Sequence, residues 1–233
     1  MKLAIMQPYI FPYIGYFQLI RAVDKFVFFD DVNYIKKGWV NRNQILVNKK
    51  SHLFTVPLKA ASQNILINKV KLAPEYLKWR DKFLTTVKQS YKKAPFFAEI
   101  FDLIVTSLNH KDNIRDLCFQ STKLLLNYLG LNTNIECSSS KYRNAHLIGK
   151  ERILDICKKE KCSTYINSIR GVELYDFQDF KNKGLVLKFI KTKPLNYKQF
   201  ENVFVPNLSI IDVLMFNGKK NTLEIIDNYK LIN

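Results

Sequence analysis

The sequence predicts an α/β fold: a Rossmann-like, mostly parallel sheet with a helical insertion in the middle of the chain. Three observations support this. An apolar run at 2–6, a helical pattern at 13–23 and a second apolar run at 26–29 form the βαβ unit of a parallel sheet. Apolar residues then recur at three- and four-residue spacing through 75–130. From residue 134 onward, strand and helix patterns alternate again.

The other elements follow from turn residues and prolines. Two strands, 41–47 and 51–57, flank a polar turn, and Pro74, Pro95 and Gly130 mark the ends of three central helices. The predicted elements are helices 75–92, 96–109 and 113–129, strand 134–137, helix 148–160, strands 164–167 and 185–190, and helices 209–216 and 219–228. Because no repeat or composition break separates the halves, we expect one domain over 1–233, with 75–130 as its insertion.

Composition excludes several classes of protein. A hydrophobic content of 47% is enough for a large core and excludes a disordered chain. No apolar run reaches 18 residues, so we expect no membrane span, and the N-terminus resembles a buried strand rather than a signal peptide. We therefore expect a cytoplasmic protein. The four cysteines lack paired spacing, so no metal site is predicted.

The formal charge of +17 is carried mainly by lysine. Thirty of the 37 basic residues are Lys, in a chain with 21 Asn, which indicates a generally basic surface suited to anionic small molecules. Nucleic-acid binding is the alternative that this charge leaves open. The chain has only seven arginines, so an Arg within a dense polar motif is informative, because its guanidinium suits bidentate recognition of phosphate or carboxylate.

The first motif is QPYIFPYIGYF at 7–17. A strand end, two prolines and a glycine before a helix predict a rigid loop whose helix N-terminus can receive an anion. A proline-stiffened core loop is the structural alternative. The binding candidates here are Gln7, Tyr9 and Tyr16.

The second motif, DDVNYIKKGWVNRN at 30–43, is denser in reactive groups. Paired carboxylates could act as a general base, and a guanidinium could hold a phosphate. Alternatively, the acidic pair caps a turn and forms a salt bridge with Arg42. The catalytic candidates are Asp30, Asp31 and Lys36, and the binding candidates are Tyr34, Trp39, Asn41, Arg42 and Asn43.

The third motif is NSIRGVELYD at 167–176. Backbone N–H groups of its glycine loop could cradle an oxyanion, although an ordinary turn would give the same pattern. The candidates are Asn167, Gly171 and Tyr175. A basic stretch at 141–152 adds His146 and Arg152.

The parallel sheet predicts where these motifs meet. Gln7 and the acidic pair should leave the same sheet edge on neighbouring strands, and Asn167 should join them if its strand is also parallel. We therefore expect one pocket, with Arg42 pointing into it, lined by Gln7, Tyr16, Asp31, Arg42, Asn167 and Gly171.

Taken together, the motifs resemble the WbqC-like family of bacterial proteins. The matching stretches are QPYIFPYIGYFQLI, DDVNYIKKGWVNRNQI, ERILDICKK, STYINSIRGVELYD and FVPNLSIIDVLMFNG. At Ser168 and Arg170 the chain departs from a family pattern richer in glycine and proline. The resemblance implies a role in the biosynthesis of surface polysaccharides such as O-antigen.

More specifically, the resemblance implies an enzyme that attaches glycine or another acyl group to the amine of a nucleotide-linked amino sugar. Asp30 or Asp31 would accept the amine proton, Arg42 and Lys36 would bind phosphate or carboxylate, and Trp39 and Tyr34 would line the pocket. The acyl donor stays open between an aminoacyl adenylate made from ATP, an acyl carrier and an aminoacyl-tRNA. A non-catalytic scaffold is an alternative, as is a nucleic-acid-binding protein.

Overall fold

The central feature is a six-stranded sheet. In a computed structural model, which describes residues 1–110, 112–200 and 203–233, its strands lie in the order β5-β2-β1-β6-β7-β8. The first five in this order are mutually parallel and β8 is antiparallel to β7. The strands are β1 (Lys2–Met6), β2 (Lys25–Phe28), β5 (Asn134–Glu136), β6 (Thr164–Ser168), β7 (Val186–Thr192) and β8 (Tyr229–Ile232).

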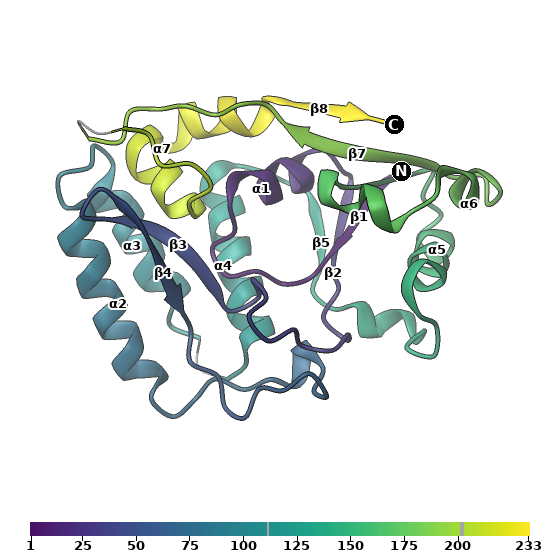
Figure 1. Cartoon of the computed structure of the whole chain (residues 1–233), viewed down its shortest axis with the longest axis horizontal. Coiled ribbons are helices and arrows are strands. Elements are labelled where there is room, and N and C mark those ends of the chain that lie inside the picture. The colour runs from purple at the N-terminus through teal and green to yellow at the C-terminus, as the bar shows by residue number, and fades with distance from the viewer. Residues whose placement is uncertain (111, 201–202) are drawn as a thin grey trace.

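Helices cover both faces of this sheet (Figure 1). Successive strand residues point to opposite faces, so Ala4 and Phe26 pack with α1 and α7, whereas Leu3 and Val27 pack with α5 and α6. Because both faces are buried, the strands are continuous apolar runs rather than alternating ones. The helices are α1 (Ile14–Arg21), α5 (Gly149–Lys159), α6 (Phe177–Lys181) and α7 (Ile210–Asp227).

The strand order locates a switch in chain direction. The chain builds β1, β2 and β5 toward one side and then returns to place β6 and β7 on the other side of β1. This is the order 3-2-1-4-5 of doubly wound nucleotide-binding sheets, in which ligands bind beyond the carboxyl ends of the strands at the point of reversal. In this chain that point lies between β1 and β6.

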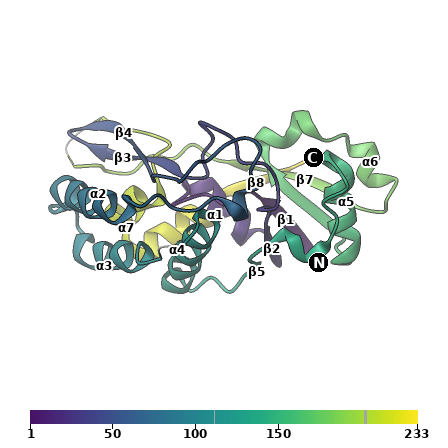
Figure 2. The same ribbon diagram turned by 90° about the horizontal axis from the view of Figure 1, so that it is seen from below.

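A second group of elements lies at one end of the molecule, with α5 and α6 at the other end (Figure 2). Strands β3 and β4 form an antiparallel hairpin. Its two turn residues, Asn48 and Lys49, both have positive φ, as a type I′ turn requires. The elements of this group are β3 (Arg42–Val47), β4 (Lys50–Thr55), α2 (Tyr76–Tyr91), α3 (Phe97–Ser107) and α4 (Ile114–Leu129).

The predicted α/β class and the mostly parallel sheet are confirmed. The short edge strand β8 was not predicted. The two predicted C-terminal helices meet in α7 at Gly218, whose φ of 61° and ψ of −166° kink the chain. The division of the chain into domains stays a prediction. Among the described residues, no helix combines the length and apolar character needed to span a bilayer.

Candidate functional site

Polar residues from four strands meet at the carboxyl edge of the sheet. Gln7 follows β1, the pair Asp30-Asp31 follows β2, Ser139 follows β5, and Asn167 lies at the end of β6. Strands β1 and β2 are adjacent and in register, with Met6 opposite Phe28. The predicted convergence of the three motifs on one edge is therefore confirmed; that they line a common pocket stays a prediction.

Asp30 is fully buried and held by the segment after β5. Its Oδ1 accepts hydrogen bonds from the Ser138 hydroxyl at 2.8 Å and from the Ser139 backbone N–H at 3.0 Å. Its Oδ2 has no hydrogen-bond donor among the described residues, and the Arg115 guanidinium lies 3.5 Å away. Burial raises the pKa of Asp30, against the opposing effects of the Ser138 hydrogen bond and of Arg115.

Asp31 forms a buried ion pair with Arg152. The Asp31 carboxylate is bonded on one oxygen by the Arg152 guanidinium and on the other by the Ser139 hydroxyl. Arg152, which is 4% exposed, also donates to the Asp31 backbone carbonyl at 3.1 Å and to Asn144 Oδ1 at 3.0 Å. Its guanidinium stacks 4.8 Å from the centre of the Phe29 ring. These contacts fix α5 to the end of β2.

A second group of side chains, termed here the arginine–aromatic cluster, lies beside the switch point. It consists of Tyr9, Tyr13, Trp39, Arg42 and Arg170. The Tyr9 ring centre lies 6.4 Å from that of Tyr13 and 6.2 Å from that of Trp39. Burial raises the pKa of Tyr9, Tyr13 adds to the rise, and the charges of Arg170 and Arg42 oppose it. Both arginines therefore lie close enough to the Tyr9 hydroxyl to influence its pKa.

The charges of the two arginines of this cluster are not neutralised by a carboxylate of any described residue. Arg42 Nε donates to the Gly38 carbonyl at 2.8 Å, and its guanidinium lies 5.3 Å from the Trp39 ring centre. No ion pair joins Arg42 or Arg170 to another described residue. The Trp39 ring is 42% exposed. A flat aromatic surface beside two unpaired guanidinium groups suits a ligand with a ring and an anionic group.

Helix α1 begins at the same place. Its N-cap residue is Tyr13, whose side chain makes no hydrogen bond to the N-terminal amides. The Tyr13 ring lies over the first turn, where a Cβ on Gly15 would come within 2.4 Å of it. A side chain at position 15 would therefore have to displace the Tyr13 ring. An uncapped helix N-terminus carries partial positive charge and favours an anion.

Four of the predicted binding residues make structural hydrogen bonds. Tyr16 donates to the Gln7 carbonyl at 3.0 Å, and Tyr34 donates to Asn41 Oδ1 at 2.7 Å. Asn41 in turn donates to the Val56 carbonyl, and Asn43 donates to the Phe11 carbonyl at 2.5 Å. These four side chains are buried: Tyr16 ties α1 to the loop after β1, and the other three tie the loops after β1 and β2 to the β3–β4 hairpin.

The remaining candidates are spread along the edge. Asn167 is buried, donates to the Tyr165 hydroxyl at 3.2 Å, and lies so close to Gly171 that a Cβ there would meet it at 3.0 Å. The half-buried Tyr175 packs edge-on against Tyr165. Lys36 is exposed in the loop after β2, and His146 is exposed before α5.

Sequence reasoning missed several residues of this edge. Ser138 and Ser139 lie just beyond the predicted strand 134–137 and were not made candidates, although a run of three serines at the end of a strand is itself a signal. Arg115 was assigned only to a helix. Arg170 was noted as a departure from a family pattern but was not made a candidate. Its charge opposes the rise in the pKa of both Tyr9 and Tyr13, which indicates that it lies near these two residues.

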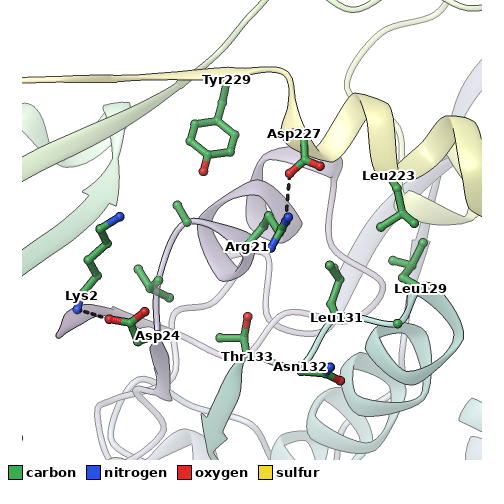
Figure 3. Close-up of a pocket in the computed structure, with 13 residues that line it drawn as sticks. Lys2, Arg21, Asp24, Leu129, Leu131, Asn132, Thr133, Leu223, Asp227 and Tyr229 are labelled. Carbon is green, nitrogen blue, oxygen red and sulfur yellow. Dashed lines mark hydrogen bonds and ion pairs between the residues drawn. The ribbon is translucent and has the colours of Figure 1, made fainter.

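A surface pocket lies at the opposite edge of the sheet (Figure 3). Lys2, Asp24 and Thr133 in its wall stand at the amino ends of β1, β2 and β5. An exposed ion pair between Arg21 and Asp227 crosses it at 2.9 Å. Because ligands of such sheets bind at the carboxyl ends of the strands, we place the candidate site at the other edge. Nowhere in the described residues do three or more His, Cys, Asp or Glu side chains gather as metal ligands would.

The fold and this edge define an α/β protein with two arginines beside its switch point. Comparison with known proteins places it further: residues 7–224 match the model of the WbqC-like protein family, and the chain belongs to that family. An uncharacterized protein of Mycobacterium tuberculosis, Rv1507c, is 30% identical over 227 residues, which cover 93% of each chain. No solved structure matches.

Proposed function

We propose that this protein is an enzyme of surface-polysaccharide biosynthesis that binds a nucleotide-linked amino sugar at the β1–β6 switch point and acylates its amine. One observation carries the proposal. Two scarce arginines, Arg42 and Arg170, lie near Tyr9 and have no carboxylate partner among the described residues, and the N-cap residue of α1 makes no side-chain cap. A nucleotide diphosphate supplies the negative charge that this arrangement favours.

The ligand would be oriented by the arginine–aromatic cluster. The diphosphate would lie between the guanidinium groups and the first turn of α1, and the base would stack on the exposed Trp39 ring. The sugar would then extend along the edge toward the end of β2. This direction brings its amine toward Asp31.

The proposed reaction forms one C–N bond. The sugar amine attacks the carbonyl carbon of an activated acyl donor, the bond from that carbon to its leaving group breaks, and the amine loses a proton. Asp31 is the better placed acceptor, because it is 7% exposed whereas Asp30 is fully enclosed. Each oxygen of the Asp31 carboxylate already accepts one hydrogen bond and has a second lone pair, on which the proposal places the proton.

The other groups have supporting roles in the proposal. Asp30, with its serine partners, would hold the end of β2 in place, and the exposed Lys36 would meet the leaving group of the donor. The donor would be an aminoacyl adenylate made from ATP, an acyl carrier or an aminoacyl-tRNA. The catalytic roles of Asp30, Asp31 and Lys36 stay predictions.

Binding is tested with tryptophan fluorescence. The chain has two tryptophans, so Trp79→Phe leaves Trp39 as the sole reporter at the cluster. We expect a UDP-linked 4-amino sugar to quench this signal. The double variant R42A/R170A should weaken binding at least tenfold, whereas R21A, which removes an arginine at the opposite edge, should not.

Equal affinity in R42A/R170A and R21A would contradict the proposed site. Turnover is then measured as amide product with each donor class. Asp31→Asn should retain sugar binding and lose turnover. If generic RNA or DNA binds in a salt-dependent shift assay and no nucleotide sugar binds, the nucleic-acid alternative replaces this proposal.

A further inference from the structure

A second site lies at the far end of β3. We term it the lysine pocket. It has a volume of about 950 Å³ and is lined by Leu46, Asn48, Lys49, Gln89, Ser90, Lys92, Lys93, Pro95, Lys198, Phe200 and Phe216. Six residues of extended chain separate Arg42 from Asn48, a distance of about 20 Å at 3.4 Å per residue. The lysine pocket is therefore separate from the arginine–aromatic cluster.

Its charge is uniformly positive among the described lining residues. Four of them are lysines and none is a carboxylate. None of these lysines forms an ion pair with a described residue. Lys92 ends α2, where part of its charge offsets the negative end of the helix dipole. Lys49, Lys93 and Lys198 remain to attract an anion.

One wall of the pocket is aromatic. Phe200 and Phe216 meet edge-to-face with ring centres 4.8 Å apart, and both are half-buried. Phe200 has a φ of 51°, in the left-handed region that a bulky residue rarely adopts. The surrounding contacts therefore hold this residue in an unfavourable backbone conformation, with its ring against Phe216. Such positions are concentrated at ligand-binding sites.

A buried carboxylate, Asp212, joins three walls of the pocket. It accepts hydrogen bonds from Tyr91 at 2.8 Å, from Tyr197 at 2.6 Å and from Gln199 at 2.7 Å. These donors directly precede Lys92, Lys198 and Phe200 in the chain. The Tyr91 hydroxyl also accepts from the backbone N–H of Leu46, at 2.7 Å.

Gln199 fixes the same region further. Its amide donates to the Val205 carbonyl at 3.1 Å and accepts from the Val205 N–H at 2.7 Å. This pair of bonds joins Gln199 to Val205. The walls that carry the lysines are thus held by a connected polar network, which gives the pocket a preformed shape.

We propose that the lysine pocket binds a diphosphate ester, with the diphosphate among the lysines and its apolar or planar group against Phe200 and Phe216. Lysine ammonium groups bind phosphate as point charges and need no fixed geometry, which suits flexible side chains at a pocket rim. The volume falls in the range of small-molecule sites, and the mixture of an apolar wall with a few charged groups is typical of them.

Isothermal titration calorimetry tests this with three probes: inorganic pyrophosphate, geranyl diphosphate and UDP. We expect an organic diphosphate to bind at least tenfold more tightly than pyrophosphate. The variant K93A/K198A should weaken this binding at least tenfold. The control K78A/K123A removes two exposed lysines elsewhere and should not. Phe200→Ala should remove the preference over pyrophosphate.

The comparison of geranyl diphosphate with UDP identifies a chain or a ring as the apolar group. All titrations are repeated in R42A/R170A, which leaves the lysine pocket intact, so failure of the site at the switch point does not affect the result. Binding that is lost in R42A/R170A and kept in K93A/K198A would overturn the proposal. Equal loss in K93A/K198A and K78A/K123A would overturn it too, because general charge alone would then explain binding.

Discussion

The buried ion pair between Arg152 and Asp31 gives a direct measure of how the carboxyl edge is held together. Arg152→Ala leaves the Asp31 carboxylate buried and removes hydrogen bonds to the Asp31 carbonyl and to Asn144, as well as the contact with the Phe29 ring. Removal of one partner from a buried pair costs about 3–5 kcal/mol. The smaller value already lowers the folding equilibrium constant by about a hundredfold.

Arg21→Ala is the matched control. The Arg21–Asp227 pair has the same chemistry, but its side chains are 49% and 54% exposed, and such pairs contribute about 1 kcal/mol or less. Urea unfolding at pH 7, followed by circular dichroism, gives both free energies of unfolding. In the double variant D31N/R152A we expect a smaller loss than the sum of the two single losses, because no charge is left unpaired. If Arg152→Ala costs no more than Arg21→Ala, the reasoning about this edge is refuted.

Two further predictions concern stability. Burial raises the pKa of Asp30 above its ordinary value of 3.8. At pH values between the ordinary and the raised pKa, the folded state therefore binds more protons than the unfolded state, and the free energy of unfolding falls as pH rises. Asp30→Asn removes this pH dependence. In urea unfolding from pH 4 to pH 7, the free energy of unfolding of the variant should therefore rise relative to that of wild type. Parallel dependence of the two free energies on pH would contradict this prediction. Gly218→Ala should cost about 2–5 kcal/mol, because positive φ is unfavourable and the new Cβ would lie 2.5 Å from the Phe96 ring. Gly149→Ala is the control, because Gly149 also has a positive φ but a Cβ there would meet no neighbouring atom. Its expected cost in stability is about 1–2 kcal/mol. Equal shifts in melting temperature for the two variants would refute the role of Phe96.

The fold was predictable because its local patterns agree with its tertiary structure. The run at 2–6, the helix after it and the run at 26–29 became β1, α1 and β2 in parallel register. Burial on both faces makes such strands apolar throughout, which is visible in a single sequence. The edge strand β8 was not predictable, because its four residues YKLI are half-exposed and gain their pairing from β7, about forty residues earlier.

The candidate site was predictable only in part, because sequence shows which groups lie at strand ends and not which of them neutralise one another. Asp30 and Asp31 were placed correctly beyond β2. The alternative of a salt bridge between the acidic pair and Arg42 did not arise: the partners are Arg115 and Arg152, from the starts of α4 and α5. Such pairings depend on contacts more than 80 residues apart in the chain.

Because Asp30 and Asp31 pair with other arginines than Arg42, the few arginines say more about where an anion would bind than the net charge of +17 does. Arg152 pairs with Asp31, and Arg115 is shared between Asp116 at 2.5 Å and Asp30 at 3.5 Å. If Arg42 had been the partner of Asp30 and Asp31, Arg170 alone would supply an unmatched guanidinium to the arginine–aromatic cluster. Because it is not, the charges of Arg42 and Arg170 remain unmatched by any described carboxylate beside the uncapped start of α1. A fixed local excess of positive charge at the switch point favours an anionic ligand there, whereas thirty lysines, most of them solvated, favour no one place on the surface.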